Sequence, residues 1–123
     1  MSVETDILTS AAEIMTADRI GALEENDVTS VMIVEGKRLV KYRDGSEKMQ
    51  MVIMLQGQGA DQQQLMSDMG TMSDALCKNA RSIRGTGYNV QSARVTLAPV
   101  PVAKNAFMWF YKSNIEIVYI KKE

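Results

Sequence analysis

Hydrophobic residues follow two different periods along this chain, and these periods separate predicted helices from predicted strands. Over residues 3–17 the apolar positions recur every three or four residues, which is typical of a helix with one buried face. The residues of this stripe are Ile7, Leu8, Ala11, Ile14 and Met15. Ser2 or Thr5 is suited to cap the helix, because a side-chain oxygen there meets a free backbone N–H group.

A second helical period covers residues 61–79, which we interpret as the clearest helix of the chain. Its stripe consists of Leu65, Met69, Met72 and Leu76. Asp61, with Gln64 three residues later, resembles a capping box, in which two backbone donors are satisfied. We therefore predict two amphipathic helices, each packed on something apolar.

Extended segments lie around these helices. Residues 28–34 are rich in β-branched side chains, Glu35-Gly36 interrupts them, and residues 37–43 resume the extended pattern. Asp44-Gly45 predicts a tight hairpin turn, because glycine readily adopts the positive φ that such a turn needs. A strand over residues 49–55 follows, and Gly57-Gln58-Gly59 is predicted to end it.

The last third of the chain predicts two more strands. Residues 88–97 form the first, and Pro99 and Pro101 make residues 98–105 a turn or an edge connection. Residues 107–121 form a long final strand. The acidic run Glu24-Glu25-Asn26-Asp27 is predicted to be a solvated loop. Together these elements predict a single α+β domain over residues 1–123, with an antiparallel sheet of about four or five strands and two helices on one face.

Two of the predicted strands carry large apolar side chains on both faces. A strand with one solvated face should alternate cleanly between apolar and polar residues. Six side chains break that alternation on the face away from the helices, and we take them as candidate subunit-interface residues: Val52, Met54, Met108, Phe110, Val118 and Ile120. The sequence predicts that this second face is partly covered, either by residues 28–34 or by another subunit.

Composition and charge add three constraints. Ten methionines suit either a methionine-rich core or an adaptable contact surface. A single cysteine excludes an internal disulfide, and no apolar run approaches the roughly 20 residues that cross a bilayer, so we expect a cytoplasmic protein. Residues 1–36 hold eight acids and one base, while the remainder holds thirteen bases and seven acids. The acidic segment either lies across the basic remainder of its own chain or meets a neighbouring copy.

Residues that support catalysis or metal binding are sparse. The chain has no histidine, which removes the commonest general base and metal ligand. Cys77 is interpreted as a small buried hydrophobe rather than a reactive thiol, and Asp61, Asp68 and Asp74 as solvated helix acids rather than magnesium ligands. We predict no catalytic, cofactor or metal site, and therefore no enzyme.

Three further patterns have structural and functional interpretations. Gly57-Gln58-Gly59 precedes a helix but lacks the third glycine or the lysine of a phosphate-binding loop. The loop with Arg81 and Arg84 is basic, yet the sequence pI of about 5.5 argues against a dedicated nucleic-acid binder. Trp109 with its aromatic neighbours is interpreted as core rather than as a base-stacking platform.

One series of residues resembles a known family. Lys41-Tyr42-Arg43-Asp44-Gly45-Ser46 is followed by the extended Met49–Leu55 and by Asp61 at the start of a helix. A glycine-punctuated stretch and Phe110-Tyr111 with Ile115-Glu116-Ile117-Val118-Tyr119 complete it. This series, over roughly residues 37–121, is similar to the minor capsid or tail-terminator-like proteins of long-tailed bacteriophages and prophages.

The resemblance implies a structural virion protein, found at the tail or neck of the virion and in the bacterial host cytoplasm during assembly. It implies a homo-oligomeric ring, typically hexameric, which caps the tail tube and joins it to head-completion proteins. No membrane and no sequence-specific nucleic acid are expected as partners. The alternative is a small cytoplasmic ligand- or protein-binding module, with its pocket between the sheet and helix 61–79. An enzyme using acids alone is a third hypothesis.

Overall fold

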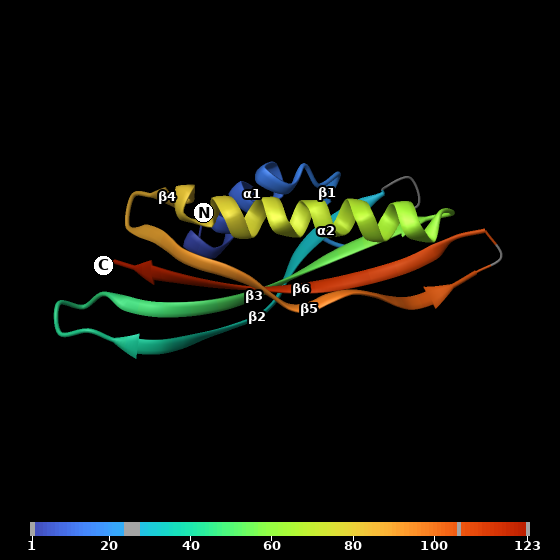
Figure 1. Ribbon diagram of the computed structural model, residues 1–123. Helices are drawn as coiled ribbons and strands as arrows, with labels where there is room; N and C mark the ends of the chain where they lie inside the picture. The colour runs from blue at the N-terminus through green and yellow to red at the C-terminus, as the bar shows by residue number, and fades with distance from the viewer. Residues whose placement is uncertain (1, 24–27, 106, 123) are drawn as a thin grey trace.

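The computed structural model describes residues 2–23, 28–105 and 107–122, in which a six-stranded sheet carries two helices on one face (Figure 1). In chain order the elements are α1 (Val3–Met15), β1 (Arg19–Ile20), β2 (Thr29–Lys41), β3 (Glu47–Gly59), α2 (Gln62–Asn79), the 3-10 turn η1 (Ala80–Ser82), β4 (Arg84–Gly85), β5 (Tyr88–Lys104) and β6 (Trp109–Lys121). The predicted acidic loop at residues 24–27 lies outside the described residues.

The strand order is β1-β2-β3-β6-β5-β4, and β1 runs parallel to β2 while all the other neighbours are antiparallel. The α+β class is therefore confirmed. The predicted count of four or five strands, all antiparallel, is wrong. The extra strands β1 and β4 are two residues long, too short to show any periodicity, and each depends on pairing with a longer neighbour.

Two long hairpins, β2–β3 and β5–β6, make up most of the sheet. The central pair β3 and β6 stays in register over its whole length, from Glu47 opposite Lys121 to Gly59 opposite Trp109. Alternate side chains in the middle of this pair are buried beneath the helices: Met51, Ile53 and Leu55 from β3, and Tyr111, Ser113, Ile115, Ile117 and Tyr119 from β6. Because successive side chains of a strand point to opposite faces, the residues between these buried ones lie on the face away from the helices.

Both predicted helices form, and their apolar stripes close the core. Ile7, Ala11 and Met15 of α1 and Leu65, Met69 and Leu76 of α2 are at most 3% exposed. Ser2 caps α1, with its Oγ accepting the Thr5 N–H at 3.1 Å. At α2 half of the predicted capping box is present.

Asp61 supplies that half, because its Oδ1 accepts the Gln64 N–H at 3.1 Å. The Gln64 side chain does not return to the Asp61 backbone. Instead its Nε2 donates to Asp68 Oδ1 at 2.8 Å, one turn further along the helix. The prediction that two backbone donors are satisfied reciprocally is therefore wrong for the second donor.

Strand β3 continues through Gly57-Gln58-Gly59, so the predicted end of the strand there is wrong. Gly57 is buried below α2, and a Cβ atom at this position would lie 2.7 Å from Met69 Sδ and 2.9 Å from Leu65 Cδ1. The glycine allows the helix to approach the sheet closely and does not act as a strand breaker.

Two other predicted interruptions are also absorbed into strands. Strand β2 runs through Glu35-Gly36, with a register shift between Ile33 and Glu35 that marks a bulge. Strand β5 continues through Pro99 and Pro101 to Lys104, so no turn forms there. The edge position is correct: within the described part of the chain, no strand pairs with the outer side of β5 beyond Asn89.

The Asp44-Gly45 turn forms as predicted. Gly45 has a φ of 93°, and the Tyr42 N–H donates to the Ser46 carbonyl at 2.8 Å, closing the hairpin. Asp44 Oδ1 accepts both the Ser46 hydroxyl at 2.6 Å and the Ser46 N–H at 2.9 Å. These bonds favour the ionised carboxylate and lower the pKa of Asp44.

Candidate assembly surface

The sheet face turned away from both helices, here called the outer face, carries most of the six predicted interface residues. Val52 and Met54 alternate with buried residues of β3, and Phe110, Val118 and Ile120 alternate with buried residues of β6. Met108 lies in the turn before β6. All six are half-buried in the single subunit, so each keeps apolar surface in contact with water.

The structure does not bring these six side chains together in one patch. Val118 lies opposite Gln50, and Val52 lies between Glu35 and Glu116. Met54 stands nearer the middle, between Met32 of β2 and Asn114 of β6. Val52 and Met54 are neighbours on the outer face of β3, as are Val118 and Ile120 on β6, whereas Lys112, Asn114 and Glu116 separate Phe110 from Val118.

The chain itself covers one end of the outer face. Ala22 and Leu23, which follow β1, line a cavity of about 370 Å³ together with Met32, Gln56 and Phe110, among others. The predicted cover by residues 28–34 is wrong, because residues 29–34 belong to β2 and lie within the sheet. The middle and the other end of the outer face have no such cover among the described residues.

Exposed apolar side chains also lie on two hairpin ends that project beyond the helices (Figure 1), and Phe107 on one of them is the most exposed large apolar side chain of the described residues, at 82%. We call residues 36–47, at the end of the β2–β3 hairpin, the first arm. Residues 98–109, at the end of the β5–β6 hairpin, form the second arm at the opposite end of the molecule. Leu39, Val40 and Tyr42 are exposed on the first arm, and Val102 and Phe107 on the second.

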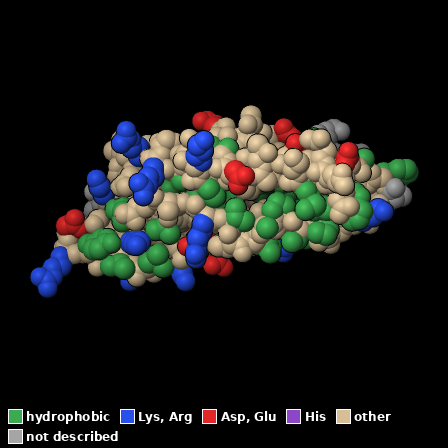
Figure 2. Space-filling view, viewed as in Figure 1, with side chains coloured by type: hydrophobic (Ala, Val, Ile, Leu, Met, Phe, Trp, Pro, Cys, Tyr) green, Lys and Arg blue, Asp and Glu red, His purple; other side chains and the backbone are tan. Residues whose placement is uncertain are grey.

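Sequence reasoning missed the arms, because the predicted strands were shorter than the observed ones. A 13-residue strand such as β3 spans roughly 43 Å at 3.3 Å per residue. The 13-residue helix α1 spans only about 20 Å at 1.5 Å per residue. The 18-residue helix α2 spans about 27 Å, so neither helix is as long as β3, and the hairpin ends extend beyond both (Figure 1). Figure 2 shows hydrophobic side chains along the sheet layer out to both ends.

The predicted chemistry-bearing residues have structural roles. Asp61 caps α2 and Asp68 accepts from Gln64. Cys77 is half-buried rather than buried, and burial, followed by the nearby Asp74 charge, raises the pKa of its thiol. In the described ranges no three carboxylate, cysteine or histidine side chains are grouped to hold a metal ion.

Trp109 is engaged on two sides. Its ring meets Tyr111 edge-on, with centroids 6.4 Å apart, and Lys104 Nζ lies 4.8 Å from its centroid. The cation occupies a ring face that a stacked base would need.

The space between α2 and the sheet is filled by side chains of the core. Leu65, Met69 and Leu76 are between 0 and 3% exposed there, and a cavity of about 390 Å³ lies at the edge of this layer, lined by Met15, Val28, Thr29, Asp68 and Met72, among others. Neither helix among the described residues has the length and apolar character that crossing a membrane requires.

The acidic N-terminal segment is partly neutralised within its own chain. Glu4 Oε1 lies 3.6 Å from Lys121 Nζ, and Asp18 Oδ2 accepts the backbone N–H groups of Val28 and Thr29 at 3.0 and 3.2 Å. The Asp18 contacts stay within residues 1–36, whereas the Glu4–Lys121 pair joins this segment to the basic remainder of its own chain. Three of its acids, at positions 24, 25 and 27, lie outside the described residues.

The fold has a counterpart among solved structures. No protein-family model matches the sequence, and no curated protein matches it. A chain in a structure described as the virion of a native gene transfer agent particle is similar, with a TM-score of 0.54 and 14% sequence identity. The similarity covers 98% of this chain and 93% of the other. At this identity the similarity establishes the shared fold.

Proposed function

We propose that this protein is a structural subunit of a phage-related virion, and that it forms a ring at the tail or neck. In this role the ring caps the finished tail tube and joins it to head-completion proteins. Three lines support the proposal: the residue series over positions 37–121, the fold shared with a chain of a gene transfer agent virion, and the exposed arms.

The observation that carries the proposal is the apolar surface of the two arms. Phe107 is 82% exposed and Val102 53% exposed on the second arm, and Val40 is 44% exposed on the first. Removing a large apolar side chain from water contributes roughly 1.5–3 kcal/mol, so a second copy covering an arm gains substantial free energy. The outer face adds half-buried apolar groups such as Met54.

The shape of the subunit favours a ring over a symmetric dimer. The two arms differ in sequence and project from opposite ends, so a contact between them joins unlike surfaces. Contacts of this kind repeat from copy to copy, and they close into a ring when the rotation between copies divides a full turn evenly. We expect a hexamer, as in the family that the sequence resembles.

The mechanism is assembly without catalysis. A ring at the growing end of the tail tube occupies the surface on which the next tube subunit would dock, and elongation stops. The opposite side of the ring remains available to head-completion proteins.

Size-exclusion chromatography with light scattering, followed by electron microscopy, tests the proposal. We expect one discrete oligomer with a central hole, formed either alone or on purified tail tubes. A protein that stays monomeric at every concentration and does not bind tube ends would contradict it.

A further inference from the structure

A groove lies at the end of the molecule where α2 finishes and β5 begins. Its volume is about 830 Å³, and its lining includes Arg81, Arg84, Tyr88, Gln91, Ser92 and Lys122. We call it the basic groove. None of the described residues that line it is acidic. Lysine and arginine side chains gather at this end of the molecule in Figure 2.

The three cations come from three separate parts of the chain, which hydrogen bonds and strand pairing hold together. Arg81 follows α2 in η1, and its Nε donates to the Gln91 carbonyl at 3.3 Å. Arg84 lies in β4. The backbone N–H of Lys122 donates to the carbonyl of Gly87 at 2.7 Å, which holds Lys122 beside the turn that follows β4. An arginine carries five N–H donors, so Arg81 keeps others for a ligand.

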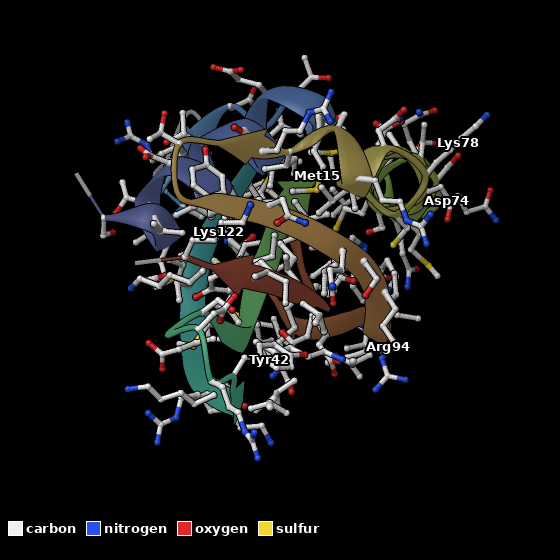
Figure 3. The ribbon with its side chains drawn as sticks, turned by 90° about the vertical axis from the view of Figure 1, so that its left-hand side faces the viewer. Met15, Tyr42, Asp74, Lys78, Arg94 and Lys122 are labelled. Atoms are coloured by element: carbon white, nitrogen blue, oxygen red, sulfur yellow. The ribbon has the colours of Figure 1, made fainter. Side chains whose placement is uncertain are left out.

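Other charged groups near the groove have different partners or positions. Lys121 pairs with Glu4 at 3.6 Å, leaving Lys122 as the C-terminal cation of the groove. Asp44 is close enough to Lys122 for their charges to interact, but it lies in the turn of the first arm and does not line the groove. Figure 3 views the molecule from this end and labels Lys122.

The residues that line the groove favour a polynucleotide over an acidic protein as its ligand. A protein partner needs a buried apolar centre to contribute binding energy. The groove offers little for such a centre, because Val90 is only 2% exposed and Tyr88 is half-buried. Phosphate oxygens accept hydrogen bonds from cationic, amide and hydroxyl donors. The groove has all three kinds, because Gln91 and Ser92 add neutral donors to the cations.

We propose that the basic groove binds the phosphate backbone of a polynucleotide without reading its sequence. The contacts are charge-assisted hydrogen bonds from Arg81, Arg84 and Lys122, whose forked or rotatable donors suit phosphate oxygens. The net charge of the chain is −1, so binding by a single copy is weak and is lost as salt rises. The proposal concerns a surface separate from the arms and does not depend on the ring.

The test is fluorescence anisotropy with labelled DNA of about 20 nucleotides, single-stranded and duplex, between about 50 and 200 mM NaCl. The test variant combines Arg81→Gln with Arg84→Gln. The matched control combines Lys104→Gln with Lys112→Gln, two residues at the opposite end of the β5–β6 pair that remove the same charge away from the groove. Thermal melting of both variants establishes that they are folded.

We expect wild-type binding at low salt to weaken about tenfold in the groove variant, with a salt slope lower by about two, one for each cation removed. The control should stay close to wild type. No binding to either DNA form, or equal losses in the two variants, would overturn the proposal. So would a groove-dependent preference for poly-glutamate over DNA, which would assign the groove to an acidic polypeptide.

Discussion

The hydroxyl of Tyr119 donates a hydrogen bond to Glu4 Oε2 at 2.7 Å, joining residues 115 positions apart in the chain. Tyr119 is 1% exposed in the last strand, and Glu4 belongs to the first turn of α1. Lys121 Nζ lies 3.6 Å from the other carboxylate oxygen of Glu4. The start of α1 is thereby fixed to the far end of the sheet by two contacts from β6.

Tyr119→Phe should lower the free energy of unfolding by about 1–2 kcal/mol, because it removes a buried hydrogen bond to a charged acceptor. Urea denaturation measures the change. Tyr42→Phe is the matched control: Tyr42 is exposed on the first arm, so its change should be below about 0.5 kcal/mol. Equal effects of the two substitutions would contradict the structural role of the Tyr119–Glu4 bond.

Stability should also fall at alkaline pH. Burial, and then the hydrogen bond to Glu4, raises the pKa of Tyr119 above its ordinary value of 10.0. The unfolded chain therefore releases this proton near pH 10 while the folded chain retains it, so the free energy of unfolding is highest below pH 10 and decreases above it. Denaturation curves between pH 8 and 11 should decline less steeply for Tyr119→Phe than for wild type. Parallel curves would show that Tyr119 is not the group responsible.

Gly57→Ala should destabilise the fold by about 1–3 kcal/mol, because the added methyl overlaps buried side chains of α2. The overlap is with Met69 Sδ at 2.7 Å and Leu65 Cδ1 at 2.9 Å. Gly59→Ala is the control in the same strand, since its nearest atom, Leu65 Cβ, would be 3.9 Å away. Thermal melting should separate the two variants clearly. Similar melting temperatures would mean that α2 does not need the close approach.

Asn114→Leu should leave stability unchanged or raise it by about 1 kcal/mol. Asn114 Oδ1 is buried and has no hydrogen-bond partner among the described residues, so its removal loses no bond and relieves a desolvation cost. Asn105→Leu is the contrasting change. Asn105 Oδ1 accepts the Phe107 and Met108 N–H groups at 2.9 and 2.8 Å, so its loss should cost about 1 kcal/mol. A large loss on Asn114→Leu would show that its amide is satisfied in solution.

Assembly should depend on side chains that folding does not need. Phe107→Ser on the second arm should leave the melting temperature of the subunit unchanged and weaken the oligomer. On the outer face, Phe110→Ser and Val118→Asp should impair assembly more than folding. Light scattering measures the oligomer and circular dichroism the fold. Met66→Ser controls for lost apolar surface, because Met66 is 43% exposed on α2 outside the arms. Unchanged ring formation by folded Phe110 and Val118 variants would refute the outer face as an interface.

The parts of the fold that local chemistry determines could be predicted from the sequence. The stripes of both helices, the Ser2 and Asp61 caps and the Gly45 turn all depend on residues within a few positions of one another. The lengths of the strands depend on distant partners. Gly57 continues β3 because α2 lies on it, which no pattern around residue 57 reveals.

The candidate surface was likewise predicted in part. Alternation along β3 and β6 assigned Val52, Met54, Phe110, Val118 and Ile120 to one face, and all five lie half-buried on the outer face. The alternation of apolar and polar residues predicts the face of the sheet on which a side chain lies, but not whether the strand extends beyond the helices. It therefore gave no indication that Val102 and Phe107 extend past the helices, nor that Arg81, Arg84 and Lys122 meet around one groove.

Pro99 and Pro101 lie in the stretch of β5 whose outer side has no paired strand among the described residues. Proline has no amide hydrogen, so a foreign strand aligned with this stretch would lack two of the donors that a continuous ladder needs. Fibril growth by edge-to-edge strand addition is thereby hindered along the longest strand of the molecule. Among the described residues, β2 beyond Val31 also has no strand on its outer side and contains no proline, so this protection is confined to the β5 edge.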